Sequence, residues 1–158
     1  MPTIYAMVGT IGAGKTTFAA KLANEKNAVF YSIDRAVKDL GKPITSREDY
    51  DKYYFLVRTA IAAGAVEALK NGRPVVLDFG GSRGHAEWLD GIAAEAGAAI
   101  EIYHLLAPLE VRRERVRKRN LEPDVVFRFS DEEFDSMPTV SAAPEERAGL
   151  KVRVVRTG

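Results

Sequence analysis

The chain has 158 residues, enough for one domain with a buried core, and its 46% apolar and 28% charged residues indicate a folded globular protein instead of a disordered or fibrous one. The formal net charge of +1 gives no overall attraction to nucleic acid or to an anionic membrane, and no apolar run approaches the roughly 20 residues of a membrane span. Cysteine is absent, which excludes disulfides and thiolate metal sites and agrees with the cytoplasmic location that we expect.

Short apolar runs alternate along the chain with segments of helical spacing. Strands are predicted over residues 3–8, 28–33, 74–79, 99–106 and 150–155. Helices are predicted over residues 15–26, 35–40, 46–72, 82–96 and 109–120. Such alternation indicates βαβ units, hence a single α/β/α three-layer domain over residues 1–158 with a parallel sheet covered on both faces.

Residues 121–143 show little apolar periodicity, apart from a sequence, SDEE, that is typical of a capped short helix at Ser130–Glu133. The segment follows a helix rich in arginine. We therefore expect residues 121–138 to form a lid over the ligand site.

The sequence VGTIGAGKTT lies between the first predicted strand and the first predicted helix, and it fits the pattern G-x-x-x-x-G-K-[ST]. Glycines allow backbone N–H groups to crowd around phosphate oxygens, and the helix that follows directs its positive end to the same place. The alternative, a glycine-rich turn with an ordinary surface lysine, does not account for the flanking strand and helix. The expected nucleotide contacts are Gly9, Gly12, Ala13, Gly14, Lys15, Thr16 and Thr17.

Three side chains of this loop have expected roles. Lys15 would bridge the β- and γ-phosphates of a nucleoside triphosphate, and the Thr16 hydroxyl would take a Mg²⁺ position. Thr17 would reach the α-phosphate.

Two carboxylates lie at the carboxyl ends of predicted strands, at the sheet edge where open α/β folds bind ligands. Asp78 could hold the water shell of Mg²⁺, or it could cap the next turn. Asp34 could orient an acceptor hydroxyl and receive its proton, or it could be the N-cap of the helix predicted over residues 35–40.

Six basic residues lie between Val111 and Asn120. At 3.6 residues per turn they spread around a helix, which weakens a nucleic-acid interpretation and leaves a solvated helix as the simple alternative. Arg115 and Arg119, one turn apart, share a face, so they could stack on a base and neutralise a transferring phosphate.

The remaining sequence narrows the class of nucleotide-binding protein. A guanine-specific protein would normally carry N-K-x-D, and no such sequence is present. A motor or AAA+ module needs a further helical domain, for which 158 residues leave no room. These exclusions favour a small phosphotransferase that uses ATP and Mg²⁺.

The chain resembles the small P-loop kinases related to zeta toxins and chloramphenicol phosphotransferases. The similarity covers most of the chain and lies in GTIGAGKTT, the strand-end Asp34, GRPVVLDFG, LAPLEVRRERVRKRN and, more loosely, APEERAGL. The resemblance implies a five-stranded parallel sheet of order 2-3-1-4-5 and MgATP-dependent phosphorylation of a hydroxyl. It also implies that Arg115 packs on adenine and that Arg119 is a lid arginine that reaches the phosphates.

The acceptor pocket lies where this resemblance is weakest, since GSRGHAEW stands after LDFG in place of the aromatic residues and arginine usual there. Candidate acceptor contacts are Arg58, Arg83, His85, Tyr50, Tyr53 and Tyr54, although ordinary packing explains the tyrosines equally well. The acceptor is thus a small-molecule alcohol of undefined identity, with a nucleotide sugar or a polynucleotide 5′-end as alternatives. A non-catalytic nucleotide-binding module is the alternative from another class, and the chain could be a monomer or a homodimer.

Overall fold

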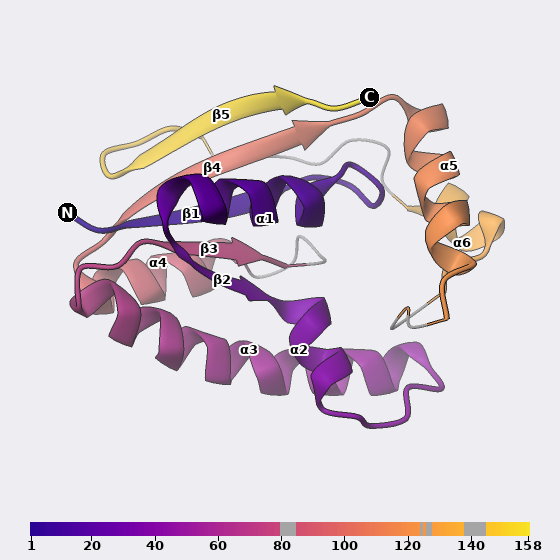
Figure 1. Ribbon diagram of the computed structural model, residues 1–158, viewed down its shortest axis with the longest axis horizontal. Helices are drawn as coiled ribbons and strands as arrows, with labels where there is room; N and C mark the ends of the chain where they lie inside the picture. The colour runs from indigo at the N-terminus through magenta and orange to yellow at the C-terminus, as the bar shows by residue number, and fades with distance from the viewer. Residues whose placement is uncertain (80–84, 124, 126–127, 138–144) are drawn as a thin grey trace.

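Five parallel strands form one sheet in the order β2-β3-β1-β4-β5, which confirms the predicted fold (Figure 1). The computed structural model describes residues 1–79, 85–123, 125, 128–137 and 145–158. The strands are β1 (Thr3–Val8), β2 (Val29–Ser32), β3 (Val75–Asp78), β4 (Ala99–Leu106) and β5 (Leu150–Arg156). The helices are α1 (Lys15–Lys26), α2 (Ile33–Asp39), α3 (Arg47–Lys70), α4 (His85–Ala96), α5 (Leu109–Asn120) and α6 (Asp131–Ser136).

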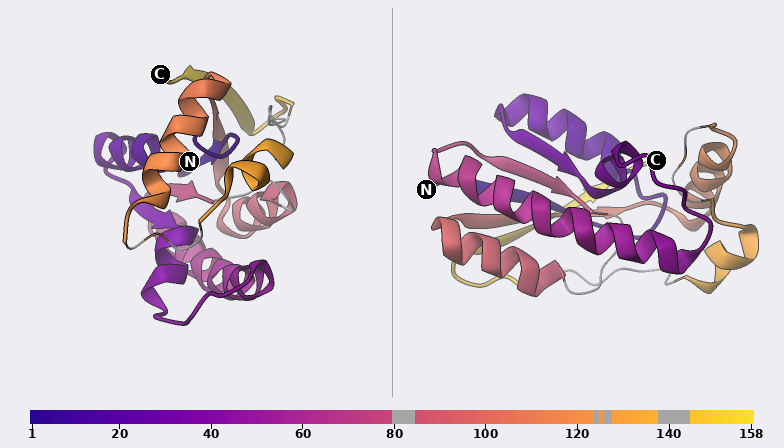
Figure 2. Two further views of the ribbon diagram at one scale, coloured as in Figure 1. Left: turned by 90° about the vertical axis from the view of Figure 1, so that its right-hand side faces the viewer. Right: turned by 90° about the horizontal axis from the view of Figure 1, so that it is seen from below.

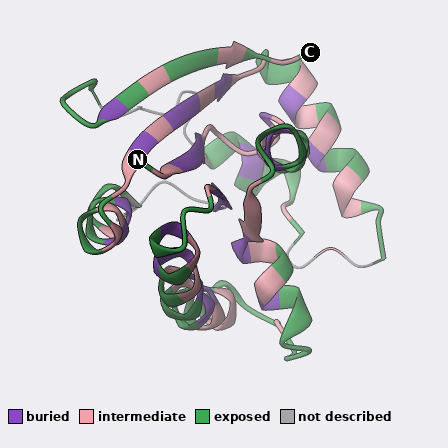
Figure 3. Ribbon diagram, turned by 60° about the vertical axis from the view of Figure 1, so that its left-hand side comes forward, coloured by how far each residue is buried: buried purple, intermediate pink, exposed green. Residues whose placement is uncertain are grey.

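Two apolar clusters lie on opposite faces of the sheet, as expected for parallel strands that are covered on both sides. On one face Ala19 and Leu22 of α1 pack with Met7 of β1. On the other face Ile61 of α3 and Ile92 of α4 belong to a larger cluster. Figures 1 and 2 show α1 on one side of the sheet and α3 and α4 on the other, while Figure 3 shows buried inner strands and a largely exposed β5 at the edge.

The start of α2 differs from the prediction by a few residues, and the difference changes the meaning of Asp34. Strand β2 ends at Ser32, whose hydroxyl oxygen accepts a hydrogen bond of 3.3 Å from the Arg35 N–H and so caps the helix. The prediction of a strand through residue 33 was therefore wrong, and so was the alternative that Asp34 is the N-cap. Asp34 lies in the first helical turn, and its carboxylate is not needed to begin α2.

Other helix ends follow local signals. The Ser46 hydroxyl accepts a hydrogen bond of 3.1 Å from the Asp49 N–H and caps α3, as predicted. Ser130 and Glu133 form a reciprocal capping box at the start of α6, also as predicted. Of the helix predicted over residues 82–96, the first part lies outside the described residues. No helix in the described ranges is both long and apolar enough to cross a membrane.

The carboxyl ends of the parallel strands lie at one end of the sheet, beside the loop after β1 and helices α5 and α6 (Figures 1 and 2). Residues far apart in sequence meet there. This end of the molecule carries the candidate site.

Candidate functional site

The loop between β1 and α1 has the backbone of an anion-binding turn. Gly12 and Gly14 have φ angles of 79° and 94°, which glycine adopts without strain. A Cβ atom on Gly12 would lie 2.6 Å from the backbone oxygen of Arg112, so the loop packs too closely against α5 for any side chain at this position. Gly14 is the N-cap of α1 and supplies no side-chain acceptor, so the first amides of the helix are available to an anion.

The Lys15 side chain folds back over this loop. Its ammonium donates hydrogen bonds to the backbone oxygens of Gly9 at 2.5 Å and Thr10 at 3.4 Å. Removal from water lowers the pKa of Lys15, while the nearby carboxylates of Asp78 and Asp34 act in the opposite direction. A phosphate beside the ammonium would therefore stabilise its charged form.

A hydrogen bond joins α1 to strand β3, which lies between β2 and β1 in the sheet. The Thr16 hydroxyl donates to Oδ2 of Asp78 at 2.7 Å, across 62 residues of sequence. Burial raises the pKa of Asp78, whereas hydrogen bonds from Thr16 and Ser32 and the charge of Lys15 lower it. Because the Thr16 proton is directed to Asp78, the lone pairs of its oxygen stay open to a cation.

These residues fit Mg²⁺, which binds through a few protein oxygens together with waters and substrate phosphates. Thr16 supplies one oxygen, and Asp78 lies behind it where its charge would attract the cation. Within the described ranges, no group of three or more acidic, histidine or cysteine side chains could hold a metal without other ligands. The cation would therefore depend on the phosphates of a nucleotide.

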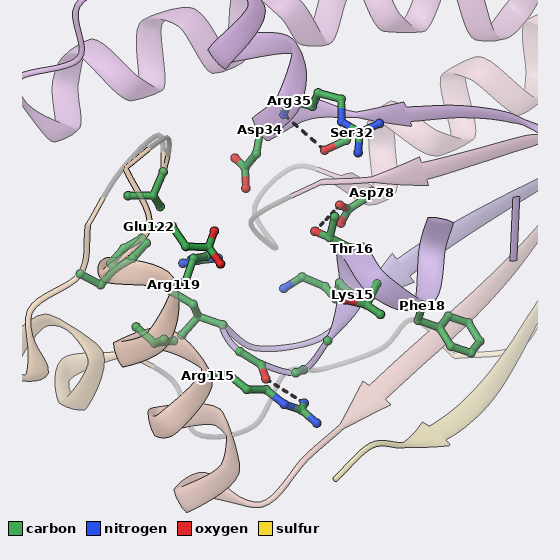
Figure 4. Close-up of a pocket in the computed structure, with 18 of the residues that line it drawn as sticks. Lys15, Thr16, Phe18, Ser32, Asp34, Arg35, Asp78, Arg115, Arg119 and Glu122 are labelled. Atoms are coloured by element: carbon green, nitrogen blue, oxygen red, sulfur yellow. Dashed lines mark hydrogen bonds between the residues drawn. The ribbon is translucent and has the colours of Figure 1, made fainter. Parts of the chain in front are cut away.

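Asp34 faces Lys15 across the same cavity (Figure 4). The Tyr50 hydroxyl of α3 donates a hydrogen bond to its Oδ1. Burial, and then the charge of Asp34, raise the pKa of Tyr50 far above its usual value, so the tyrosine is a neutral donor at physiological pH. The same two causes raise the pKa of Tyr54, whose ring centre lies 5.8 Å from that of Tyr50. Oδ1 of Asp34 is thus held by Tyr50.

The two arginines predicted on one face of α5 differ in their contacts. Arg115 donates from Nη1 to the backbone oxygen of Gly12 at 3.1 Å and to the Thr157 hydroxyl at 2.9 Å. The Arg119 guanidinium lies 5.8 Å from the ring centre of Phe129, and its Nε is buried with no hydrogen-bond acceptor in the described part of the chain. Both arginines line the cavity, but only Arg115 is tied to the loop.

The cavity has a volume of about 860 Å³ and brings together most of the predicted site residues. Those that line it are Gly12, Ala13, Gly14, Lys15, Thr16, Thr17, Asp34, Tyr50, Asp78, Arg115 and Arg119. Gly9 does not line it, but its carbonyl accepts from Lys15.

Among the other candidate acceptor contacts, the described side chains of Arg58, Tyr53 and Tyr54 do not line the cavity. Arg58 lies over the Trp88 ring at 5.1 Å, and Tyr53 packs beneath Lys52 at 5.6 Å. Arg83 lies outside the described residues, and His85 begins α4 with a side chain that is not described. Tyr54 is buried behind Tyr50 and does not line the cavity.

Sequence reasoning missed several lining residues, among them Arg35, Lys38, Glu122, Val125, Phe129 and Thr157. A signal existed for Thr157, because it follows the last strand at the same carboxyl edge as the two carboxylates. No local sequence pattern identifies Glu122 or Phe129 as site residues. Both belong to the segment predicted as a lid, and they line the cavity. Figure 4 shows the Glu122 side chain directed into the cavity beside Arg119.

Part of the predicted lid is fastened to α5. Arg117 and Arg113 pair with Asp131 and Asp135 of α6 at 2.9 and 2.6 Å. The Asn120 side chain donates to the backbone oxygen of Phe129 at 2.6 Å and accepts from its N–H at 3.1 Å, which closes the base of the intervening loop. Residues 124, 126, 127 and 138 of the predicted lid lie outside the described part of the chain.

Comparison with known proteins places this geometry in a family. The model of the AAA domain family matches residues 4–144. A shikimate kinase of Brucella abortus is 30% identical over 128 residues, which are 81% of this chain, but the chain spans only 61% of the length of that relative.

Solved structures share the fold. A proposed kinase of Chloroflexus aurantiacus superposes with a TM-score of 0.83 at 18% identity, over 98% of this chain and 85% of its own. A sugar kinase of a Janibacter species gives a TM-score of 0.60 at 21% identity, over 99% and 85% of the two chains. At these identities the structures show a common fold alone. The chain therefore belongs to the AAA domain family and has a P-loop NTPase-like α/β fold.

Proposed function

We propose that the protein is a MgATP-dependent phosphotransferase that moves the γ-phosphate to a hydroxyl of a small molecule. The observation that supports this most directly is the placement of Asp34 opposite Lys15, with the Thr16–Asp78 pair between them, around one cavity. A phosphate-binding loop alone would serve many functions. A carboxylate held on the other side of the phosphate position is what a hydroxyl acceptor requires.

In this proposal the loop amides and Lys15 bind the triphosphate, and Arg115 lies on the base side. Thr16, with Asp78 behind it, would hold Mg²⁺, which would supply positive charge to offset that of the phosphates. The Nε of Arg119, which is buried without an acceptor among the described residues, would be satisfied by a phosphate oxygen.

Asp34 acts on the acceptor. Its Oδ2 accepts the hydroxyl proton while the acceptor oxygen attacks the γ-phosphorus, and the bond to the β–γ bridging oxygen breaks so that ADP leaves. Tyr50 stabilises the other carboxylate oxygen and limits rotation of the side chain. Orientation of the nucleophile is a large part of catalysis in phosphoryl transfer.

The identity of the acceptor is open within this class. The relatives and neighbours named as shikimate and sugar kinases support a small hydroxyl compound. The net charge of +1 disfavours a polynucleotide 5′-end, and a nucleotide sugar would follow if the narrower zeta-toxin-like resemblance holds. The Tyr50–Asp34 contact favours an enzyme over a regulatory nucleotide-binding module, which would have no need of it.

Lys15→Ala is expected to abolish the thermal stabilisation that MgATP gives the wild type, because binding to the folded state raises the melting temperature by mass action. Without nucleotide its melting temperature should not fall, since the ammonium is poorly solvated in the folded protein. Lys70→Ala, an exposed change at the end of α3, is the control and should keep the full shift. Equal shifts in all three proteins would remove Lys15 from the site.

The lid predicted over residues 121–138 should close on the nucleotide through Arg119. Hydrogen exchange measured for residues 121–123 and 128–137 is expected to slow when an ATP analogue binds. Arg119→Met should reduce this protection because it removes the group that joins phosphate to Phe129, whereas Lys118→Met, an exposed change on the same helix, should not. Identical exchange with and without the analogue would make the segment a fixed cap.

Asp34→Asn should lower transfer to the acceptor by about two orders of magnitude or more, because general-base help is typically worth ~10²–10⁴-fold. MgATP affinity should stay within a few-fold of wild type, and the melting temperature should be unchanged since Ser32 caps α2. Asp39→Asn, exposed on the same helix, is the matched control. The acceptor is first found by screening small alcohols, sugars, antibiotics and nucleotide sugars.

Near-normal transfer by Asp34→Asn would end the base assignment. Loss of MgATP binding in the same variant would instead assign Asp34 to the magnesium site.

A further inference from the structure

Three successive carbonyl groups of the phosphate loop accept hydrogen bonds from side chains that are distant in sequence. Arg112 Nη1 donates to the oxygen of Ile11 at 3.4 Å, and Arg115 Nη1 donates to that of Gly12 at 3.1 Å. The third carbonyl, of Ala13, accepts from the Thr157 hydroxyl at 2.7 Å across 144 residues. Two of these donors belong to α5, but the shortest bond comes from Thr157, the residue that follows β5.

Thr157 is itself fixed from two further directions. Its hydroxyl oxygen accepts from Arg115 Nη1 at 2.9 Å, and its backbone N–H donates to the oxygen of Leu106 at 2.8 Å, at the end of β4. Because the single hydroxyl proton goes to Ala13, the hydroxyl cannot donate elsewhere without breaking this bond. A chain of two hydrogen bonds thus joins α5 to the loop, from Arg115 through Thr157 to the Ala13 carbonyl.

The hydrogen bond from Thr157 affects phosphate binding through the peptide bond between Ala13 and Gly14. No peptide bond in the described residues is cis, so the N–H of Gly14 points opposite to the carbonyl of Ala13. Gly14 is the N-cap of α1, at the end of the helix where an anion binds. A bond that fixes the Ala13 carbonyl therefore also fixes an amide of the phosphate-binding turn.

We propose that Thr157 is a positioning residue for the phosphate loop, so that this residue after β5 controls the affinity for the triphosphate group itself and not for the base. This inference rests on the proposed binding of a nucleoside triphosphate at the loop. It also gives Arg115 a role in bracing the loop that is separate from the adenine contact suggested by family resemblance.

The test compares the binding of magnesium tripolyphosphate with that of MgATP by calorimetry, which needs neither an acceptor nor turnover. Thr157→Val keeps the shape of the side chain and removes the hydroxyl. It should weaken both ligands by the same factor, about tenfold, because both lose an aligned loop amide. Thr157→Ser retains the hydroxyl and should restore both affinities.

Thr59→Val is the matched control, since its hydroxyl bonds a backbone oxygen in α3 far from the cavity. Thr157→Ala provides a second variant without the hydroxyl, and melting temperatures establish that each variant is folded. Weaker binding of MgATP with unchanged binding of tripolyphosphate would make Thr157 a base contact and overturn the inference. Wild-type affinity of folded Thr157→Val and Thr157→Ala for both ligands would also overturn it.

Failure of the wild-type protein to bind either ligand would instead contradict the proposed function, and this inference with it. If instead the wild type binds both ligands and the variants bind them equally well, only the inference about Thr157 fails.

Discussion

The close approach of helix α5 to the phosphate loop is the constraint on which the site depends. The backbone oxygen of Arg112 lies only 2.6 Å from the position that a Cβ atom of residue 12 would take, so only glycine permits the contact. The loop is consequently shaped from two sides. Strand β1 and helix α1 fix its ends, while α5 and Thr157 bind its outward carbonyls.

Opposite charges placed close together make this site receptive to a nucleotide with its metal. Burial disfavours the charged forms of both Lys15 and Asp78, and each partly offsets the cost of the other. A triphosphate adds negative charge beside Lys15, and Mg²⁺ adds positive charge beside Asp78. Binding of the triphosphate together with Mg²⁺ would therefore offset the cost of burying both Lys15 and Asp78 in their charged forms. Either ligand alone would offset the cost for only one of these residues.

Much of the fold could be predicted from sequence because its signals are local. Apolar runs marked the strands, the glycine-lysine-threonine pattern marked the loop, and Ser46 and Ser130 marked helix starts. The start of α2 was missed because Ser32 and Asp34 are both good caps, and only the backbone conformation decides between them.

The contacts that could not be predicted are tertiary. Tyr50 reaches Asp34 from the next helix, and Thr157 reaches the loop from the other end of the chain. Both contacts depend on how the helices pack on the sheet, and a short stretch of sequence does not determine that packing. The six basic residues of α5 show the same limit, since their composition did not reveal that Arg115 donates hydrogen bonds to the loop and to Thr157.

The central claim is that the site transfers phosphate to a hydroxyl instead of merely binding or hydrolysing ATP. The direct measurement is the fate of the label when the wild-type protein is incubated with Mg²⁺, γ-labelled ATP and a panel of small alcohols, sugars and nucleotide sugars. The account predicts label on an acceptor hydroxyl with one ADP formed for each phosphorylated molecule. Label found only in inorganic phosphate across the panel, at a rate that no acceptor changes, would contradict it.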